Sequence, residues 1–295
     1  MTDTRSLPAA PASGPTRLTM PTAGSSIYYA LQSVPWARRV ALRNWWQWWH
    51  DISSIPYNIQ DPGVAEAKLA WWRQEVIDAS QGKGTHPLTR ALFTQTDPSA
   101  APLPAAIWMD QIEGQIQLVH QTRWLDTQVW LTHCDRTTGA AAEGCAMLLG
   151  IRHPEALQIA RQLGTGWRRA HQLARLGQDA RAGWVHVPID MLQAHQVRAH
   201  ELTKPAPQAN PPFHELLNTL VTQAAEQMTT GLGAIRKLDR KERQAMKPLV
   251  VLTHLQLALL QEIKLQRDRI LHERLLLTPL KKSWISTKVR LGWLR

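Results

Sequence analysis

Apolar side chains recur at helical spacing along most of this chain, and long alternating runs of valine, isoleucine and threonine are absent. Between residues 64 and 80, for example, Leu69, Trp72 and Val76 fall on one face of a helix. Proline and glycine interrupt the pattern and mark where segments begin and end. We therefore predict helices over residues 25–50 with a break near Pro35, over 64–80, from 87 onward, over 104–120, 125–149, 154–176, 189–202 and 213–232, and from 241 or 248 to 276, followed by a short tail.

This pattern predicts an all-α protein with one helical domain. At 295 residues the chain is long enough to bury a large core, and the helix-favouring residues Leu, Ala, Gln, Arg and Glu are abundant. Residues 1–24 are rich in Thr, Ser, Pro and Ala without an apolar block, so they predict a flexible arm rather than a secretory signal. We expect the helical domain to span residues 25–277 and a basic amphipathic tail to span 278–295.

The cysteines and the apolar runs indicate the compartment in which the protein works. Cys134 and Cys145 form no C-x-x-C pair, so we expect two buried thiols in a reducing environment. No uninterrupted apolar run reaches the roughly 18 residues that a membrane-spanning helix needs. The sequence therefore predicts a cytoplasmic protein.

The net charge of +11 is concentrated toward the C-terminus. Residues 234–295 hold 15 Lys and Arg against 5 Asp and Glu. The tail carries apolar residues at helical spacing among these cations, namely Leu280, Trp284, Leu291 and Leu294. Two interpretations stay open: the tail lies on an anionic membrane, at the inner face of the bilayer, or it docks on the core with a solvated basic face. Nucleic acid is disfavoured because no recognisable binding motif accompanies the charge.

Two segments carry a more specific pattern. Residues 61–75 read DPGVAEAKLAWWRQE, and residues 177–188 read GQDARAGWVHVP. Both segments are similar to signatures of the squalene/phytoene synthase family, whose enzymes join two prenyl diphosphates head to head. Smaller matches extend the resemblance over about residues 25–284. The resemblance implies an all-α isoprenoid-synthase-like domain with a central cavity among its helices.

The resemblance also implies a magnesium site, which this family builds from two aspartate-rich helices. Mg²⁺ prefers oxygen ligands, and it neutralises the diphosphate that leaves during the reaction. At the positions of the first aspartate cluster this chain has Ser53, Ser54 and Tyr57. Asp51 is the nearby acid, but a shift of two residues along a helix turns it to another face. We also expect Pro56 to kink or end this helix.

At the second aspartate cluster one carboxylate remains. The resemblance places Arg175 at the first aspartate, whereas Asp179 keeps the second. It also places His171 at a family asparagine and Ala174 at a family arginine. The spacing of four residues predicts an ion pair between Arg175 and Asp179. In the alternative interpretation, the Arg175 guanidinium holds a phosphate where the metal would lie, because guanidinium groups bind phosphate bidentately.

Other side chains complete the candidate substrate site. The segment 25–29, which reads SSIYY, resembles an N-terminal family segment whose hydroxyls help to hold a diphosphate. The 12 histidines show no H-x-x-x-H or H-E-x-x-H spacing, so a zinc site is not expected. His171 and His186 are candidate bases, although a lone histidine is more often structural. The predicted substrate-binding residues are Asp179, Arg175, His171, Ser26, Tyr29, Ser53, Ser54 and Tyr57, and Asp179 is also a weak candidate for a metal ligand.

The resemblance leaves two classes of function. In the first, the protein is a non-catalytic or weakly active member that binds a prenyl diphosphate, another isoprenoid lipid or a protein partner. In the second, it is a transferase that uses Mg²⁺ to condense two farnesyl or geranylgeranyl diphosphates into a presqualene-, squalene- or phytoene-type product. One carboxylate in place of four is too few for a magnesium cluster, and charge neutralisation by the metal lowers the barrier by several kcal/mol. The sequence therefore favours the first class.

Overall fold

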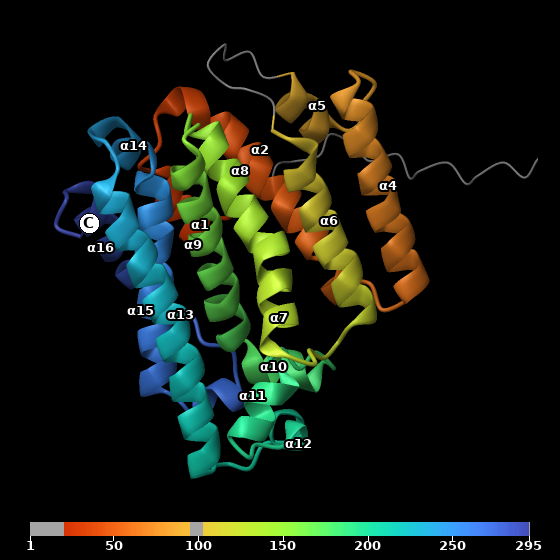
Figure 1. Ribbon diagram of the computed structural model, residues 1–295, viewed down its shortest axis with the longest axis vertical. Coiled ribbons are helices and arrows are strands. Elements are labelled where there is room, and N and C mark those ends of the chain that lie inside the picture. The colour runs from red at the N-terminus through yellow and green to blue at the C-terminus, as the bar shows by residue number, and fades with distance from the viewer. Residues whose placement is uncertain (1–20, 95–102, 295) are drawn as a thin grey trace, which may run out of the picture.

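The computed structural model describes residues 21–94 and 103–294, so most of the predicted N-terminal arm lies outside the described residues. The described chain folds into one all-α domain, whose long helices lie side by side (Figure 1). The one β pairing in the described part is an isolated bridge between Arg123 and Val185. In chain order the elements are α1 (Ser26–Leu31), α2 (Trp36–Ser53), α3 (Ile55–Asn58), α4 (Pro62–Ser80), α5 (Pro87–Phe93), α6 (Ala105–His120), α7 (Thr127–Cys134), the π-helical turn η1 (Asp135–Gly139), α8 (Ala140–Leu148), α9 (Pro154–Leu173), α10 (Leu176–Arg181), α11 (Ile189–Ala194), α12 (Ala199–Thr203), α13 (Pro211–Lys237), α14 (Arg240–Ala245), α15 (Lys247–Leu265), the 3₁₀ turn η2 (Arg269–Leu271) and α16 (Pro279–Arg290).

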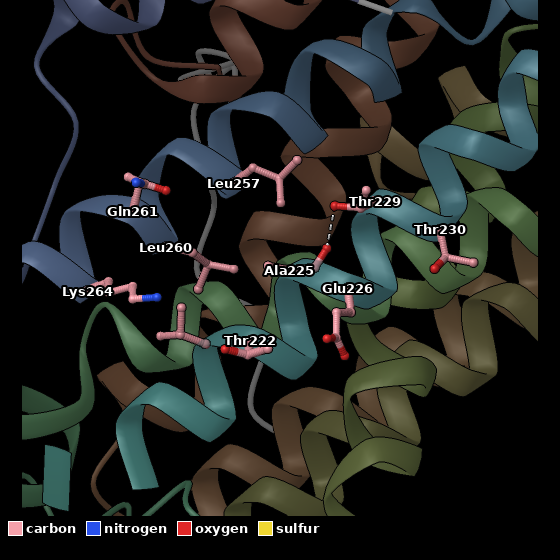
Figure 2. Close-up of a pocket in the computed structure, with 10 residues that line it drawn as sticks. Thr222, Ala225, Glu226, Thr229, Thr230, Leu257, Leu260, Gln261 and Lys264 are labelled. Carbon is pink, nitrogen blue, oxygen red and sulfur yellow. Dashed lines mark hydrogen bonds between the residues drawn. The ribbon is translucent and has the colours of Figure 1, made fainter. Parts of the chain in front are cut away.

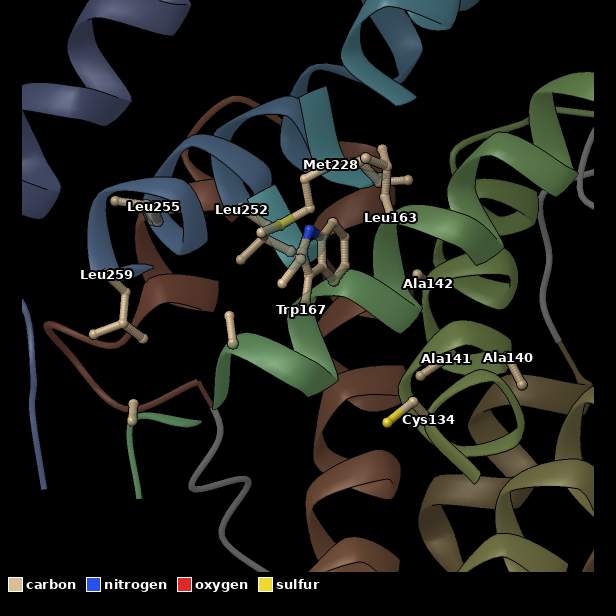
Figure 3. Close-up of a cluster of buried hydrophobic side chains, with 14 of the residues drawn as sticks. Cys134, Ala140, Ala141, Ala142, Leu163, Trp167, Met228, Leu252, Leu255 and Leu259 are labelled. Carbon is tan, nitrogen blue, oxygen red and sulfur yellow. The ribbon is translucent and has the colours of Figure 1, made fainter. Parts of the chain in front are cut away.

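Helix α9 is the centre of the core, where it packs against α8, α13 and α15. Figure 3 shows Trp167 of α9 pointing toward Met228 of α13 and Leu252 of α15. On the side facing the turn η1, which leads into α8, the contact is closer, because a Cβ atom at Gly164 would lie 2.3 Å from the Thr138 carbonyl oxygen. Only glycine allows this backbone approach. Trp167 and Gly164 therefore determine how closely α9 packs against its neighbours.

The tryptophans of α2 form a second part of the core. Trp45 and Trp48 are fully buried and stack on each other, with ring centroids 5.5 Å apart. Both meet Trp108 of α6 edge to face, at centroid distances of 4.9 and 4.6 Å. Removing a buried tryptophan typically costs about 3–5 kcal/mol. This cluster therefore anchors α2, which carries part of the candidate site.

Proline positions determine where the first helices end. The predicted break near Pro35 is confirmed, because α1 ends at Leu31 and α2 begins at Trp36. The predicted effect of Pro56 is also confirmed: α2 ends at Ser53, and the short helix α3 follows. Since proline removes a backbone donor and clashes with the preceding turn, the chain starts a new helix at each place.

The signature segment 61–75 has a structural role in the fold. Asp61 begins α4 by accepting the backbone N–H of Val64 (3.0 Å). The buried carboxylate of Glu75 accepts the backbone N–H groups of Thr85 and His86 and so holds the loop between α4 and α5. Burial alone would raise the pKa of Glu75, but the hydrogen bonds outweigh it and keep this pKa below its usual value. The two acids therefore fix both ends of α4.

Three predicted helices are interrupted in the structure. The helix predicted over residues 189–202 is divided into α11 and α12, with residues 195–198 between them. The segment predicted as one helix over residues 125–149 is divided into α7, the turn η1 and α8. The helix predicted to reach residue 276 ends at Leu265. Beyond it, the backbone N–H of Leu275 donates to the carbonyl of Ala174 (3.0 Å), and Arg181 donates to the carbonyls of Leu271 and His272. Tertiary hydrogen bonds thus replace a helix that local propensity favours.

The last helix, α16, packs against α1 and α15. Its Ile285 and Val289 are buried in this contact. Among residues 21–94 and 103–294, no helix has the length and hydropathy needed to cross a bilayer.

Candidate functional site

A cavity of about 430 Å³ lies among α1, α2, α3, α9 and α15, within the range of about 300–1,000 Å³ typical of small-ligand sites. Its apolar lining consists of Ile27, Trp46, Trp49, Trp167 and Leu252. Its polar lining consists of Ser25, Ser26, His50, Ser53, Ser54, Tyr57, Asn58, Thr138, Arg168, His171, Arg175, Gln256 and Arg274. Along both α2 and α9 the lining changes from tryptophan to polar residues toward the C-terminal end, so the cavity offers apolar walls and a polar region.

Three arginines give the polar region its charge. Arg168 comes from α9, Arg175 precedes α10, and Arg274 follows η2. No carboxylate is among the described residues that line the cavity. A hollow with several cations and no lining anion concentrates a positive potential and attracts anions.

Tyr57 joins the polar stretches of α3 and α9. The guanidinium of the buried Arg168 donates to the Tyr57 hydroxyl oxygen (Nη2 to Oη, 3.2 Å). The Arg175 guanidinium carbon lies 5.6 Å from the centre of the Tyr57 ring, in a cation–π contact. Burial raises the pKa of Tyr57, so its hydroxyl stays protonated at neutral pH. Tyr57 thus contacts two of the three arginines of the cavity.

Asp179 lies behind Arg175 rather than in the lining. The side chain of Asp179 is only 2% exposed, and its carboxylate accepts the Arg175 Nε–H (3.0 Å). Its Oδ2 also lies 3.4 Å from Nε2 of His186. Burial would raise the pKa of Asp179, but the hydrogen bonds from His186 and Arg175 outweigh it and hold this pKa below its usual value. The Asp179 carboxylate is therefore ionised and already partnered.

The hydrogen bonds around Gln172 indicate where His186 carries its proton. The indole N–H of Trp130 donates to Oε1 of Gln172 (2.7 Å), which leaves the amide nitrogen to donate to Nδ1 of His186 (3.2 Å). The ring proton of neutral His186 is thus on Nε2, facing Asp179 and the Tyr57 oxygen at 3.3 Å. The Tyr57 oxygen accepts from Arg168, and His186 lies beside both Tyr57 and Asp179.

His171 faces the same cavity as a neutral side chain. Burial and the nearby Arg168 lower the pKa of His171 to about 3. The ring is therefore uncharged at neutral pH and can donate one hydrogen bond and accept another. Among the described residues that line the cavity, the arginines supply the permanent positive charge.

The residues present do not fit the magnesium that the family resemblance implies. Ser53, Ser54 and Tyr57 line the cavity, but they offer hydroxyls instead of carboxylates. Asp51 is not part of the lining, and Asp179 is occupied by an arginine and a histidine. Within residues 21–94 and 103–294 there is no cluster of three or more His, Cys, Asp or Glu suited to a metal ion. The donor set suits an anion better than a cation.

The structure brings six of the eight predicted substrate-binding residues to this cavity, namely Ser26, Ser53, Ser54, Tyr57, His171 and Arg175. Asp179 lies directly behind Arg175. Tyr29 is not part of the lining, although its carbonyl accepts the Ser286 hydroxyl (3.1 Å). The predicted ion pair is present, but not within one helix: α9 ends at Leu173, and Arg175 is the N-cap residue of α10.

Sequence reasoning missed Arg168 and Arg274. Arg168 lies about one helical turn before His171 and two turns before Arg175, so helical spacing within α9 was the signal that pointed to it. Arg274 belongs to a segment far along the chain, and only the tertiary contact between η2 and α10 brings it to the cavity. No local pattern marks such a residue.

Gly177 sets the distance between α10 and the segment that carries Arg274. A Cβ atom at Gly177 would lie 2.0 Å from the carbonyl oxygen of Leu271. Replacing Gly177 by alanine is therefore expected to lower the free energy of unfolding by about 1–3 kcal/mol, as measured by urea denaturation. Gly233→Ala in α13 is the matched control, because no atom lies within 4 Å of its added Cβ. A Gly177→Ala protein as stable as the unsubstituted chain would contradict this account.

Two other charged or hollow regions of the described residues lack this combination of several cations with no lining acid. Figure 2 shows a groove between α13 and α15, about 410 Å³ in volume, whose charged lining residues are Glu226 and Lys264. A cluster of acids on α6, η1 and α8 is neutralised internally, because Arg161 forms ion pairs with Asp110, Asp135 and Glu143. A third region, a cavity of about 460 Å³ beside α14, also has cations and no acid in its lining. The predicted substrate-binding residues gather in the arginine-lined cavity instead, which makes that cavity the candidate substrate site.

Comparison with known proteins agrees with the fold. A family model described as squalene/phytoene synthase matches residues 20–281. A dehydrosqualene synthase crystallised with a ligand is similar with a TM-score of 0.78, at 17% identity over 91% of each chain. Squalene synthase HpnC from Alicyclobacillus acidocaldarius is similar with a TM-score of 0.70, at 17% identity over 81% of this chain and 87% of that chain. YisP from Bacillus subtilis subsp. subtilis strain 168 is similar with a TM-score of 0.62, at 18% identity over 89% of each chain. No curated protein sequence matches this chain.

Proposed function

Since the chain belongs to the squalene/phytoene synthase family, we propose that its cavity binds a prenyl diphosphate, or a related phosphorylated isoprenoid, through arginines instead of magnesium. The family supplies the ligand class, because its members act on prenyl diphosphates. The single observation that carries the proposal is the set of three arginines, Arg168, Arg175 and Arg274, in a cavity whose described lining holds no carboxylate.

The charges support a diphosphate in particular. The three arginines outnumber the one adjacent carboxylate, Asp179, by two. A diphosphate monoester carries about three negative charges, and guanidinium groups bind phosphate oxygens bidentately. The Tyr57 hydroxyl adds a neutral donor. The tryptophans of α2 and α9 supply apolar surface for an isoprenoid chain, which gains from leaving water.

We further propose that bound diphosphate is held without efficient condensation. Departure of the diphosphate from an allylic carbon requires strong stabilisation of the developing charge, and a metal ion contributes several kcal/mol to it. Arg168 and Arg175 bind the charge of the ground state as well as that of the transition state. Uniform binding of this kind strengthens affinity without raising the rate of the chemical step.

An active transferase is the second candidate, and one observation favours it: two of the structural neighbours are themselves described as synthases. Incubation with farnesyl or geranylgeranyl diphosphate, with and without Mg²⁺, separates the two candidates. We expect the protein to bind the prenyl diphosphate and to release no pyrophosphate above background. Release of pyrophosphate that Asp179→Ala abolishes would establish the transferase instead.

The basic tail over residues 278–295 supports a separate proposal about location. We propose that the protein meets an anionic membrane surface peripherally through this tail.

A further inference from the structure

Helix α16 is docked on the domain and still presents apolar side chains to solvent. Its buried side, formed by Ile285 and Val289, faces α1 and α15. On the other side, Leu280 is 83% exposed, Trp284 54% and Leu291 59%, and Trp293 just beyond the helix is 66% exposed. Large apolar side chains gathered in this way are uncommon on a surface without a partner.

Several contacts hold α16 in place. Lys282 donates to the carbonyl of Gly24 (3.0 Å), and the hydroxyl of Ser286 donates to the carbonyl of Tyr29 (3.1 Å). Lys281 forms an ion pair with Glu262 of α15. The exposed apolar face therefore belongs to a fixed helix, and it keeps its orientation relative to the domain.

Basic side chains gather beside the exposed tryptophans. The rings of Trp284 and Trp293 meet edge to face at 6.4 Å, and Lys288 lies 5.0 Å above the Trp284 ring. The residues on either side of Trp293, Gly292 and Leu294, line a cavity of about 460 Å³. The charged residues in its lining are all cations, namely Arg236, Arg240, Arg243 and Lys247. The cationic cavity thus begins beside Trp293, at the C-terminal end of α16.

We propose that this region, which we call the α14–α16 surface (Arg240, Arg243, Lys247, Leu280, Trp284, Leu291 and Trp293), docks onto a bilayer of anionic phospholipid. Tryptophan prefers the interface between headgroups and acyl chains. An apolar helix face flanked by cations is the arrangement that lies in this interface. Cations near an anionic leaflet each strengthen attachment, and the cavity of α14 and α15 offers a place for a phosphate headgroup.

The chemistry of the α14–α16 surface favours a bilayer over two other occupants. A second copy of the chain would bring like cationic cavities together, which costs free energy in a self-complementary interface. Nucleic acid would pair with the arginines, but it would leave the aliphatic Leu280 and Leu291 exposed. An anionic bilayer satisfies the charges and the apolar side chains at the same time.

Docking in this way has a consequence for the arginine-lined cavity. Helix α16 holds α1, and Ser25, Ser26 and Ile27 at the start of α1 line that cavity. A bilayer on α16 therefore lies next to α1, which lines one edge of the arginine-lined cavity. Isoprenoid chains dissolved in that bilayer would be near the cavity. This consequence rests on the proposed function, whereas docking itself does not.

Flotation of the full-length protein with lipid vesicles tests the proposal. We expect the protein to float with vesicles of phosphatidylcholine and phosphatidylglycerol and to stay behind with phosphatidylcholine alone. The double variant Arg240→Gln/Lys247→Gln is expected to weaken vesicle binding by about thirtyfold, and added salt should weaken it further. The matched control is Lys83→Gln/Arg90→Gln, which removes two exposed cations elsewhere, one in the loop between α4 and α5 and one on α5.

A fluorescent label checks the orientation. Cys134 and Cys145 are buried, so Leu280→Cys adds one accessible thiol for an environment-sensitive dye. We expect the emission to shift to the blue on anionic vesicles, and we expect no shift for the same dye on Leu125→Cys, a distant residue that is 72% exposed.

Three outcomes would overturn the proposal: equal binding to neutral and anionic vesicles, no dye shift at residue 280, or binding of an oligonucleotide in place of vesicles. Arg168→Gln keeps this test separate from the cavity proposal. We expect that variant to float normally even if it binds no prenyl diphosphate.

Discussion

Replacing Arg168 by glutamine is expected to lower the affinity for farnesyl diphosphate by two to three orders of magnitude. Arg168 is 3% exposed, lines the cavity and donates to Tyr57. Truncating one partner of a buried charge pair costs about 2–5 kcal/mol, which corresponds to roughly thirtyfold to several thousandfold in affinity. Equilibrium dialysis or calorimetric titration with the full-length protein measures the change.

Arg169→Gln is the matched control for this prediction. Arg169 is the next residue of the same helix and is also buried, but its guanidinium donates to Gln227 and Gln223 and lies outside the cavity lining. We expect this variant to retain the affinity. Equal losses in the two variants would show that the effect of Arg168→Gln is not specific to the cavity.

The ligand-free Arg168→Gln protein is expected to be as stable as the unsubstituted chain, or more so. Among the described residues Arg168 forms no ion pair with a carboxylate, so its charge is buried at a cost when no anion is present. A clear loss of stability would mean that Arg168 serves the fold and would remove the basis for assigning it to a ligand.

Acidification is expected to destabilise the protein well above the pH at which carboxylates titrate. Burial lowers the pKa of His133 well below its usual value, and burial and Arg168 lower that of His171 to about 3. Below pH about 6.5 both histidines bind protons in the unfolded chain but not in the folded one. Each then removes up to about 1.4 kcal/mol of stability per pH unit, so the pair removes about 2–3 kcal/mol between pH 6 and 5.

The free energy of unfolding in urea, measured at pH 7, 6 and 5, tests this prediction. His133→Leu should flatten the dependence on pH by about 1.4 kcal/mol per unit, whatever its effect at pH 7. A stability that is constant from pH 7 to pH 5 would contradict the account. Asp179 acts in the same direction at lower pH, because its lowered pKa means that its contribution is lost as its carboxylate becomes protonated.

Local patterns predicted most of the helices. Pro35 and Pro56 marked real breaks because the constraint that proline imposes acts within one turn. The predictions erred where distant segments compete for backbone hydrogen bonds, as at Leu275, whose N–H bonds to Ala174 in place of a helical partner. Such competition is invisible in a window of neighbouring residues.

In the candidate site, too, the local contacts were predictable from the sequence and the long-range contacts were not. Sequence spacing placed Arg175 beside Asp179 and offered two interpretations, an ion pair or a phosphate-binding group. In the structure Arg175 forms the ion pair and also lines the cavity, so the interpretations are compatible. The link from Tyr57 to His186 was not predictable, because it joins α3 to a loop far along the chain.

For the tail over residues 278–295, the sequence also offered two interpretations that are compatible in the structure. Helical spacing predicted an amphipathic segment, and α16 is such a helix. The two interpretations of the tail were membrane contact and docking on the core. Ile285 and Val289 dock it, whereas Leu280 and Trp284 stay exposed, which keeps both interpretations physically compatible. The membrane contact itself stays a proposal.

The central claim, that arginines take the place of magnesium in holding a diphosphate, is tested most directly by measuring the dissociation constant of farnesyl diphosphate in chelator and again with Mg²⁺. Arg168, Arg175 and Arg274 carry their charge in both solutions, so we predict tight binding in chelator and an affinity that magnesium changes by no more than a few-fold. Binding that is absent in chelator and appears only when magnesium is added would contradict the account.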